Sequence, residues 1–341
     1  MDCQELLDPF LGQSTAIKKL AELAHKVKDN DSSLLIQGET GAGKGALARW
    51  LHDNGPRASE PFVDLNCGSL NRELLESELF GHEKGAFTGA ICDKIGLLEI
   101  AHKGTVLLDE IADMDPQVQP KLLKVVEEKQ FRRLGGVQSK RVDIRLLAAT
   151  HRDLGSLARN HGFRSDLFFR VSTIVLHAPP LRSRPEDIPA IAQRLLRSIC
   201  SKLRVPTVDL SHIAIQALQS HQWPGNIREL KNVLYRAVLL KEDKVISNRD
   251  LQLDPQASGP AFRAASGKTL RQVEQEYIET VLALESGHVQ SAARRLGIPR
   301  STLYHKLKGY GFNFRRAGEA SGQRICDQSE VAEALRAGKV V

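Results

Sequence analysis

The chain has 341 residues, which is enough for two or three domains, and its 41% hydrophobic and 26% charged residues are typical of globular proteins. No apolar run approaches the roughly eighteen residues of a membrane span, and the N-terminus lacks a signal peptide pattern, so we expect a cytoplasmic protein without a membrane partner. The net charge of +7 favours an anionic partner such as nucleic acid. Scattered cysteines without a CxxC pair, and histidines without metal-site spacing, argue against a disulfide framework and a zinc site.

Residues 33–51 predict a strand, a glycine-rich loop and a helix in that order. This is the context of a phosphate-binding loop, in which backbone N–H groups and the helix N-terminus hold phosphate oxygens. Lys44 would reach the outer phosphates, whereas Gly45 lacks the hydroxyl that usually meets magnesium, so the metal needs other ligands or waters. We predict nucleotide binding by Gly38, Glu39, Thr40, Gly41, Ala42, Gly43, Lys44 and Gly45.

Two further strand patterns end in polar residues. Residues 61–65 run into Asn66, and residues 105–108 run into Asp109 and Glu110. Acids often end strands simply as solvated turn residues. Together with the Lys44 loop, they favour an active site in which Asp109 lies near magnesium and Glu110 polarises the attacking water.

A fourth strand pattern, residues 143–149, ends at Thr150. That hydroxyl fits either a hydrogen bond to the terminal phosphate or the cap of a turn. A fifth, residues 173–176, follows Arg164 and Arg170, which fit either surface ion pairs or arginine fingers for a neighbouring subunit's phosphate. Five buried strands alternating with helices predict an α/β domain with a parallel sheet.

Between the second and third strands lies an uncharged segment with two glycines. Glycine permits backbone angles that a side chain forbids, so the segment predicts a flexible loop that presents Phe87 and Thr88 to another molecule. The alternative is an ordinary glycine turn with a buried Phe. The segment comprises Gly85, Ala86, Phe87, Thr88, Gly89 and Ala90.

From about residue 186 to residue 253 the apolar spacing is helical throughout. Arg228 falls near the start of one of these helices, where the helix dipole does not favour a cation, so an external anion is its expected partner. Residues 254–268 are rich in Pro, Gly, Ala and Ser and are predicted to be a linker.

Residues 269–312 predict three short helices with a glycine turn before the last, which is a helix-turn-helix pattern. Between His288 and Gly318 there are seven Arg or Lys and no acid, which favours DNA binding over a merely solvated basic face. The tail 313–341 has no predicted role. The candidates to approach bases and phosphates are Arg300, Ser301, Thr302, His305 and Lys306, and those to hold the DNA backbone are Arg294 and Arg295.

Taken together, residues 9–312 resemble the sigma-54-dependent transcriptional activators, or bacterial enhancer-binding proteins, of the AAA+ ATPase superfamily. The motifs that carry the resemblance are GETGAGKG, ESELFGHEKGAFTGA, GTVLLDEI, FRSDLFFR, PPLRSRPEDI, WPGNIREL and AARRLGIPRSTLYHKL. The resemblance implies an AAA+ α/β ATPase subdomain over residues 1–185, an α-helical lid over 186–253 and an all-α Fis-type DNA-binding domain over 269–312. It also implies a homo-oligomeric ring, commonly a hexamer, with ATP and Mg²⁺ between subunits.

Matched motif by motif, the resemblance implies roles for individual residues. Asn66 would hold the catalytic Glu110 until the ring is engaged, and Asp109 would bind magnesium, directly or through water. Thr150 falls at the first sensor and Arg228 at the second. The further implied residues are Arg164 and Arg170 as trans fingers and the loop 85–90 as the contact with sigma-54.

Two residues depart from the family pattern: His151 stands where Asn is usual, and Gly45 where an acid is common. Because the ATPase pattern begins almost at Met1, the chain looks like the minority without an N-terminal sensor domain, for which a separate regulatory protein is one expected control. We predict an activator that binds double-stranded DNA upstream of promoters and uses ATP hydrolysis to open the sigma-54 polymerase holoenzyme complex. The alternatives are a nucleotide-sensing DNA-binding regulator that acts without sigma-54, and an AAA+ unfoldase or helicase loader.

Overall fold

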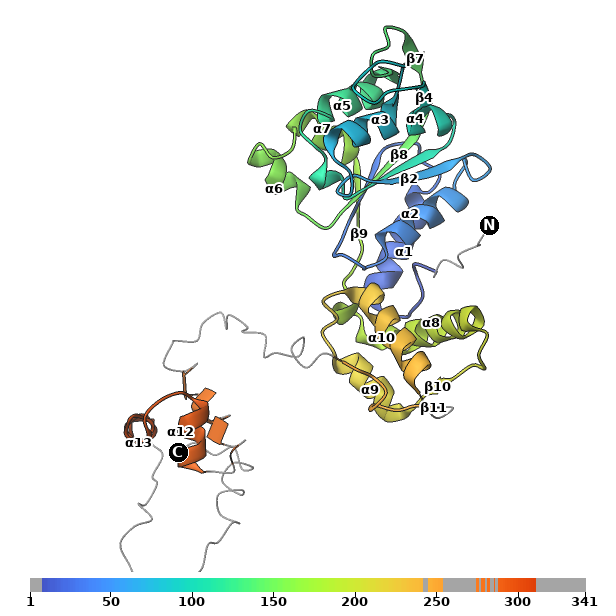
Figure 1. Cartoon of the computed structure of the whole chain (residues 1–341). Helices are drawn as coiled ribbons and strands as arrows, with labels where there is room; N and C mark the ends of the chain where they lie inside the picture. The colour runs from blue at the N-terminus through green and yellow to red at the C-terminus, as the bar shows by residue number, and fades with distance from the viewer. Residues whose placement is uncertain are drawn as a thin grey trace, which may run out of the picture. The chain divides into compact units, whose positions relative to one another are not determined.

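The computed structural model describes residues 8–241, 245–253, 274–275, 277–279, 281–282, 285 and 288–310 (Figure 1). The chain divides into two compact units, Met1–Gly259 and Pro260–Val341. The predicted linker 254–268 and tail 313–341 lie outside the described residues. Within the described ranges, no helix combines the length and the apolar character that crossing a membrane requires.

The first unit is built on a five-stranded sheet in the order β2-β5-β8-β1-β9, in which every neighbouring pair is parallel. Its strands are β1 (Leu34–Gln37), β2 (Phe62–Asn66), β5 (Thr105–Asp109), β8 (Arg145–Thr150) and β9 (Ile174–His177). All five coincide with the predicted strands, and the α/β parallel-sheet fold is confirmed. Parallel strands buried on both faces read as continuous apolar runs, which is why the pattern was detectable.

Helices cover both faces of the sheet because alternate strand side chains point to opposite sides. Leu34 and Ile36 of β1 pack with α1 and α2, whereas Leu35 packs with α3, α5 and α7. The helices of this α/β part are α1 (Thr15–Val27), α2 (Lys44–Asp53), α3 (Arg72–Phe80), α4 (Leu97–Ile100), α5 (Gln119–Glu128), α6 (Leu154–Arg159) and α7 (Ser165–Val171). The carboxyl ends of all five strands therefore meet at one edge, where ligands bind in such sheets.

Two small hairpins interrupt this alternation and were not apparent in the sequence. They are β3 (Gly81–His82) with β4 (Lys94–Ile95), and β6 (Gln130–Arg132) with β7 (Ser139–Arg141). An isolated β-bridge between His82 and Leu134 joins the two hairpins. The loop 85–90 is the tip of the first hairpin, so the two tips lie side by side.

A helical lid follows the sheet in the chain (Figure 1). Its elements are α8 (Ile188–Leu203), β10 (Asp209–Leu210), α9 (His212–Ser220), α10 (Asn226–Leu240) and β11 (Val245–Ile246). They enclose a separate apolar core around Trp223, which is fully buried and donates its indole N–H to Leu218 O at 2.8 Å. The helical lid is confirmed, and its boundaries at 186 and 253 stay predictions.

In the second unit, α12 (Val289–Arg295) and α13 (Arg300–Gly309) pack together, joined by a turn at Gly297 with φ +66°. Residues 274–275, 277–279 and 281–282 are helical and contribute to the same core, through Ile278, Val281 and Leu282. The helix-turn-helix is confirmed, although residues 269–273, at the start of the predicted module, lie outside the described residues.

The segment before α1 is tied to the lid by one buried carboxylate. Asp187 accepts hydrogen bonds from the backbone N–H groups of Gln13 (2.6 Å) and Ser14 (2.9 Å), and from Ser14 Oγ (2.5 Å). Gly12 has φ +141°, and a Cβ there would lie 2.2 Å from Asp187 Cγ, so only glycine fits the close approach. The contact holds residues 8–11 against the lid.

Replacing Asp187 with Ala removes the acceptor of these three donors, of which the two on Ser14 are buried. We expect a loss of about 2–4 kcal/mol in the free energy of unfolding, measured by urea denaturation. Asp209→Ala, at an exposed position of the lid, is the control and should change little. Equal stability of the two variants would contradict an anchoring role for Asp187.

Candidate nucleotide site

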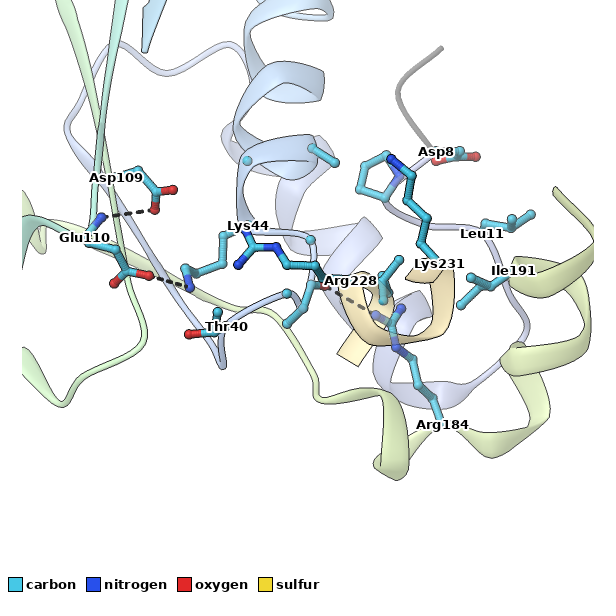
Figure 2. A pocket seen from close by; sticks show the side chains of 17 residues that line it. Asp8, Leu11, Thr40, Lys44, Asp109, Glu110, Arg184, Ile191, Arg228 and Lys231 are labelled. Atoms are coloured by element: carbon cyan, nitrogen blue, oxygen red, sulfur yellow. Dashed lines mark hydrogen bonds and ion pairs between the residues drawn. The ribbon is translucent and has the colours of Figure 1, made fainter. Parts of the chain in front are cut away.

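A cavity of about 330 Å³ lies at the carboxyl edge of the sheet, bounded by the glycine loop, residues 8–11 and the lid (Figure 2). Lys44, Asp109, Glu110 and Arg228 all line it, so the structure brings together four residues predicted from separate stretches of the sequence. The remaining lining residues are Asp8, Pro9, Leu11, Thr40, Gly41, Ala42, Gly43, Gly45, Ala46, Arg184, Ile191, Ile227 and Lys231.

The glycine loop joins β1 to α2 as predicted. Gly41 and Gly43 have φ values of +77° and +102°, and a Cβ on Gly41 would lie 2.3 Å from Gly225 O of the lid. Lys44, at the first position of α2, is only 6% exposed. Its Nζ donates to Gly38 O at 3.0 Å and lies 3.4 Å from Glu110 Oε1. The buried Lys44 and the N-terminus of α2 thus border the same cavity, which is an anion-binding arrangement.

The two acids that follow β5 have different environments. Glu110 has φ +51°, and its Oε2 accepts from His151 Nδ1 at 2.7 Å and from His151 N at 3.2 Å. Burial would raise the pKa of Glu110, but the His151 hydrogen bonds and the Lys44 charge outweigh it and hold that pKa below its ordinary value. Burial, followed by repulsion from Glu110, holds the pKa of Asp109 above its ordinary value.

Asn66 lies beside Asp109 in the register of the sheet, but its side chain makes no hydrogen bond with the Glu110 carboxylate. Its Oδ1 accepts from Gly68 N at 3.0 Å, which forms a local turn. His151 takes the place expected for Asn66: it directly follows β8, which flanks β5 on the side opposite β2, the strand of Asn66. Thr150 is fully buried, and its Oγ1 accepts from Arg152 N at 3.0 Å, so here it caps a turn.

A contact between the glycine loop and the lid was not predicted from the sequence. Arg182 donates two hydrogen bonds to the Glu39 carboxylate, at 2.5 and 2.6 Å, and thereby lowers the pKa of Glu39. Asn226 Nδ2 donates to Glu39 Oε2 and to Thr40 O, both at 3.1 Å. Asn226 Oδ1 accepts from Leu181 N at 2.7 Å, so one buried amide fastens the loop to the lid.

The only sign of this contact in the sequence is Asn226 itself, the first residue of α10. Its φ is +52°, and Asn tolerates that conformation better than most residues. Arg228, two residues further on in the same helix, is exposed and lines the cavity.

Arg164 and Arg170 do not line the cavity of their own chain. Arg164 pairs with Asp166 at 2.7 Å and Arg170 pairs with Glu127 at 2.8 Å, on exposed surface. Such pairs contribute little, about 0–1 kcal/mol, and yield readily to a stronger anion. The finger role of these arginines stays a prediction.

The loop 85–90 is closed by a hydrogen bond from Gly85 N to Ala90 O at 2.9 Å. Thr88 is exposed, as predicted. Phe87, which we expected to be presented outward, is half-buried, with its ring 5.0 Å from the His82 ring. The exposed apolar side chain at this tip is instead Ile91, which is 82% exposed and was not predicted.

The predicted DNA-binding residues gather on α12 and α13. Lys306 pairs with Glu274 at 2.6 Å and Arg295 with Glu285 at 2.8 Å, within the module. Arg294 has no ion pair among the described residues. The exposed candidates are Arg294, Arg295, Arg300, Ser301 and His305, and the half-buried ones are Thr302 and Lys306.

Comparison with known proteins accounts for nearly the whole chain. Residues 10–177 match the sigma-54 interaction domain, residues 182–267 the AAA+ ATPase lid domain, and residues 269–310 the Fis family of bacterial regulatory proteins. The regulatory protein AtoC of Escherichia coli is 42% identical over 315 residues, covering 89% of this chain and 68% of AtoC. The alginate biosynthesis transcriptional regulatory protein AlgB of Pseudomonas aeruginosa is 42% identical over 305 residues, with coverages of 89% and 68%.

A crystal structure of NtrX from Brucella abortus in complex with ATP has a similar fold. It has a TM-score of 0.68 and 32% sequence identity, and the match covers 88% of this chain and 69% of that chain. The same protein in complex with ADP matches with a TM-score of 0.66.

The loop-to-lid contact can be tested at Asn226, where Gly preserves the positive φ and removes only the side chain. Asn226→Gly leaves the Leu181 N–H unpaired and removes one of the hydrogen bonds that the Glu39 carboxylate accepts. We expect a loss of about 1–3 kcal/mol of stability, measured by urea denaturation. Asn232→Ala, on the exposed face of the same helix, is the control, and a similar loss there would contradict the assignment.

Proposed function

The chain belongs to the family of sigma-54-dependent transcriptional regulators, with an AAA+ ATPase core, a helical lid and a Fis-type helix-turn-helix, and from this premise we propose how it works. ATP is hydrolysed in the cavity beside Lys44, and the nucleotide state moves the loop 85–90. That loop acts on the closed sigma-54 polymerase complex and opens it, while the second unit holds DNA upstream of the promoter. A conformational change of this kind requires that ATP and its products interact differently with the two loop positions.

The observation that carries the proposal is the meeting of Lys44, Asp109 and Glu110 at one cavity beneath the lid. Lys44 and the α2 N-terminus would neutralise the phosphates. The Glu110 carboxylate, kept ionised by His151 and Lys44, would orient and polarise the attacking water. Arg228, on the lid, would add positive charge at the same cavity.

Magnesium fits the donor set at this cavity. Mg²⁺ is commonly held by one or two carboxylates together with substrate phosphates and water, and Asp109 supplies a carboxylate at the cavity wall. Asp109 Oδ1 accepts only one backbone hydrogen bond, from Glu110 N at 3.0 Å, which leaves acceptor capacity for a metal or its waters. Bound magnesium would neutralise charge that develops on the phosphates.

Subunits arranged in a ring, commonly a hexamer in this family, would complete the site. Arg164 and Arg170 lie outside their own cavity, and their exposed acid partners hold them weakly. We propose that they reach the phosphates of a neighbouring subunit. We further propose that a separate regulatory protein controls this activator, as the family resemblance suggests.

Thr88 tests the coupling between hydrolysis and promoter opening. Purified protein, ATP and a closed sigma-54 holoenzyme complex should give open complex, detected by permanganate footprinting. Thr88→Ala should keep its ATPase rate, because Thr88 is exposed and does not line the cavity, yet lose opening. Thr207→Ala, at an exposed lid position, should retain both activities.

Two outcomes would oppose this assignment. Loss of ATPase together with opening in Thr88→Ala would mean that the loop is structural. Normal ATPase without opening in the wild type, at any concentration, would favour a nucleotide-sensing regulator that acts without sigma-54.

Mixing two inactive variants tests whether the arginines act in trans. Arg164→Ala and Glu110→Gln should each lower the hydrolysis rate by about a thousandfold or more. In a mixed ring, Glu110 of one variant meets Arg164 of the other, so the mixture should regain activity. A mixture of Arg164→Ala with the double variant Arg164→Ala/Glu110→Gln should stay inactive, because neither chain supplies Arg164. If the first mixture does not regain activity, the site is not shared between subunits.

Salt dependence tests the DNA assignment. Arg294→Ala should weaken DNA binding and reduce the slope of log K against log salt by about one, because one phosphate contact is lost. Arg295→Ala should reduce DNA affinity and the salt slope less than Arg294→Ala does, because Arg295 is paired with Glu285. Gln290→Ala, an exposed neutral position on the same helix, should not alter the slope. An unchanged slope in Arg294→Ala would remove that residue from the interface.

A further inference from the structure

Arg184 is a buried arginine with no role in the site as described so far. It lies between β9 and α8, is 2% exposed, and lines the nucleotide cavity (Figure 2). Its Nη2 donates to Ala42 O of the glycine loop at 3.5 Å, which is a weak contact. Its Nε has no partner among the described residues. The polar capacity of this guanidinium is therefore largely unused.

The only other buried arginine among the described residues, Arg145, makes a useful contrast. Its Nη1 donates to Leu51 O at 3.2 Å and its Nη2 to Val27 O at 3.0 Å. It thereby ties the C-terminal ends of α2 and α1, where a cation is stabilised by the helix dipole. Arg145 also lacks a partner at Nε, but it does not line the cavity. Its burial is explained by the fold, whereas that of Arg184 is not.

No carboxylate among the described residues forms an ion pair with Arg184. The nearest acid in sequence, Asp187, uses both oxygens on Gln13 and Ser14. Burial lowers the pKa of Arg184, and the charge of Asp187 only partly offsets that effect. A buried cation without a counter-charge costs stability, so an external acceptor is expected where one can reach it.

We propose that Arg184 is a nucleotide-binding residue whose guanidinium takes its missing acceptors from the nucleotide bound in this cavity. The acceptors are either phosphate oxygens or the polar atoms of the nucleoside, and both suit a guanidinium. Because Arg184 precedes α8, its contact links the bound nucleotide to the lid. The inference depends on the proposed ATP site but assigns a residue that the proposed hydrolysis does not require.

The test compares Arg184→Met with Arg145→Met, using equilibrium dialysis of ATP, ADP and AMP and thermal melting with and without ATP. Arg184→Met should weaken ATP binding about ten- to a hundredfold, the usual value of a charge-assisted hydrogen bond. Its melting temperature without nucleotide should stay the same or rise, because an uncompensated charge is removed. Arg145→Met should do the opposite, with lower thermal stability and unchanged ATP affinity.

The three nucleotides identify the acceptor. A loss confined to ATP assigns the contact to the terminal phosphate, and an equal loss for ATP, ADP and AMP assigns it to the nucleoside or first phosphate. Arg184→Lys keeps the charge but loses the planar guanidinium, so its ATP affinity should lie between those of the wild type and Arg184→Met.

Wild-type ATP affinity in Arg184→Met would overturn the inference and leave the proposed function intact. A fall in melting temperature as large as that of Arg145→Met, without nucleotide, would make Arg184 a structural residue and overturn it as well. Failure of the wild type to bind ATP at all would instead contradict the proposed function itself.

Discussion

The ion pair between Lys44 and Glu110 is the interaction on which the rest of the site depends. Lys44 is buried, and a buried ammonium requires a counter-charge. Glu110 supplies it, together with the loop carbonyl of Gly38, although the same carboxylate is the proposed water-activating group. His151 holds its other oxygen. A phosphate entering beside Lys44 would therefore compete with Glu110 for the same cation, which connects nucleotide binding to the availability of the catalytic group.

The parallel sheet makes this arrangement possible. Strand β1 leads to the glycine loop, β5 to the two acids, and β8, which lies between them, to His151. Because all strands run in one direction, these groups meet at one edge without any long connection. The lid closes that edge through the Glu39, Arg182 and Asn226 contact, so the phosphate loop and the lid are joined by hydrogen bonds. A conformational change of the phosphate loop on nucleotide binding would therefore also shift the lid.

The predictable parts were those encoded in consecutive residues. The central strands are buried on both faces and end in polar side chains, which located both the sheet and the cavity edge. Contacts between residues distant in sequence were not predictable. The strands of Asn66 and His151 both flank β5, so the pairing of Glu110 with His151 rather than Asn66 depends on the local turn that occupies Asn66. The half-buried position of Phe87 depends on packing against His82 in a hairpin too short to give a strand pattern.

The most direct test of this account is the ATP affinity of Glu110→Gln, measured by equilibrium dialysis beside Lys44→Ala. Removing the charge of Glu110 takes away the competitor for Lys44, so ATP should bind as tightly as in the wild type or more tightly. Lys44→Ala should lose that affinity. If Glu110→Gln loses affinity for ATP to the same extent as Lys44→Ala, the carboxylate does not compete for the cation, and the central claim is contradicted.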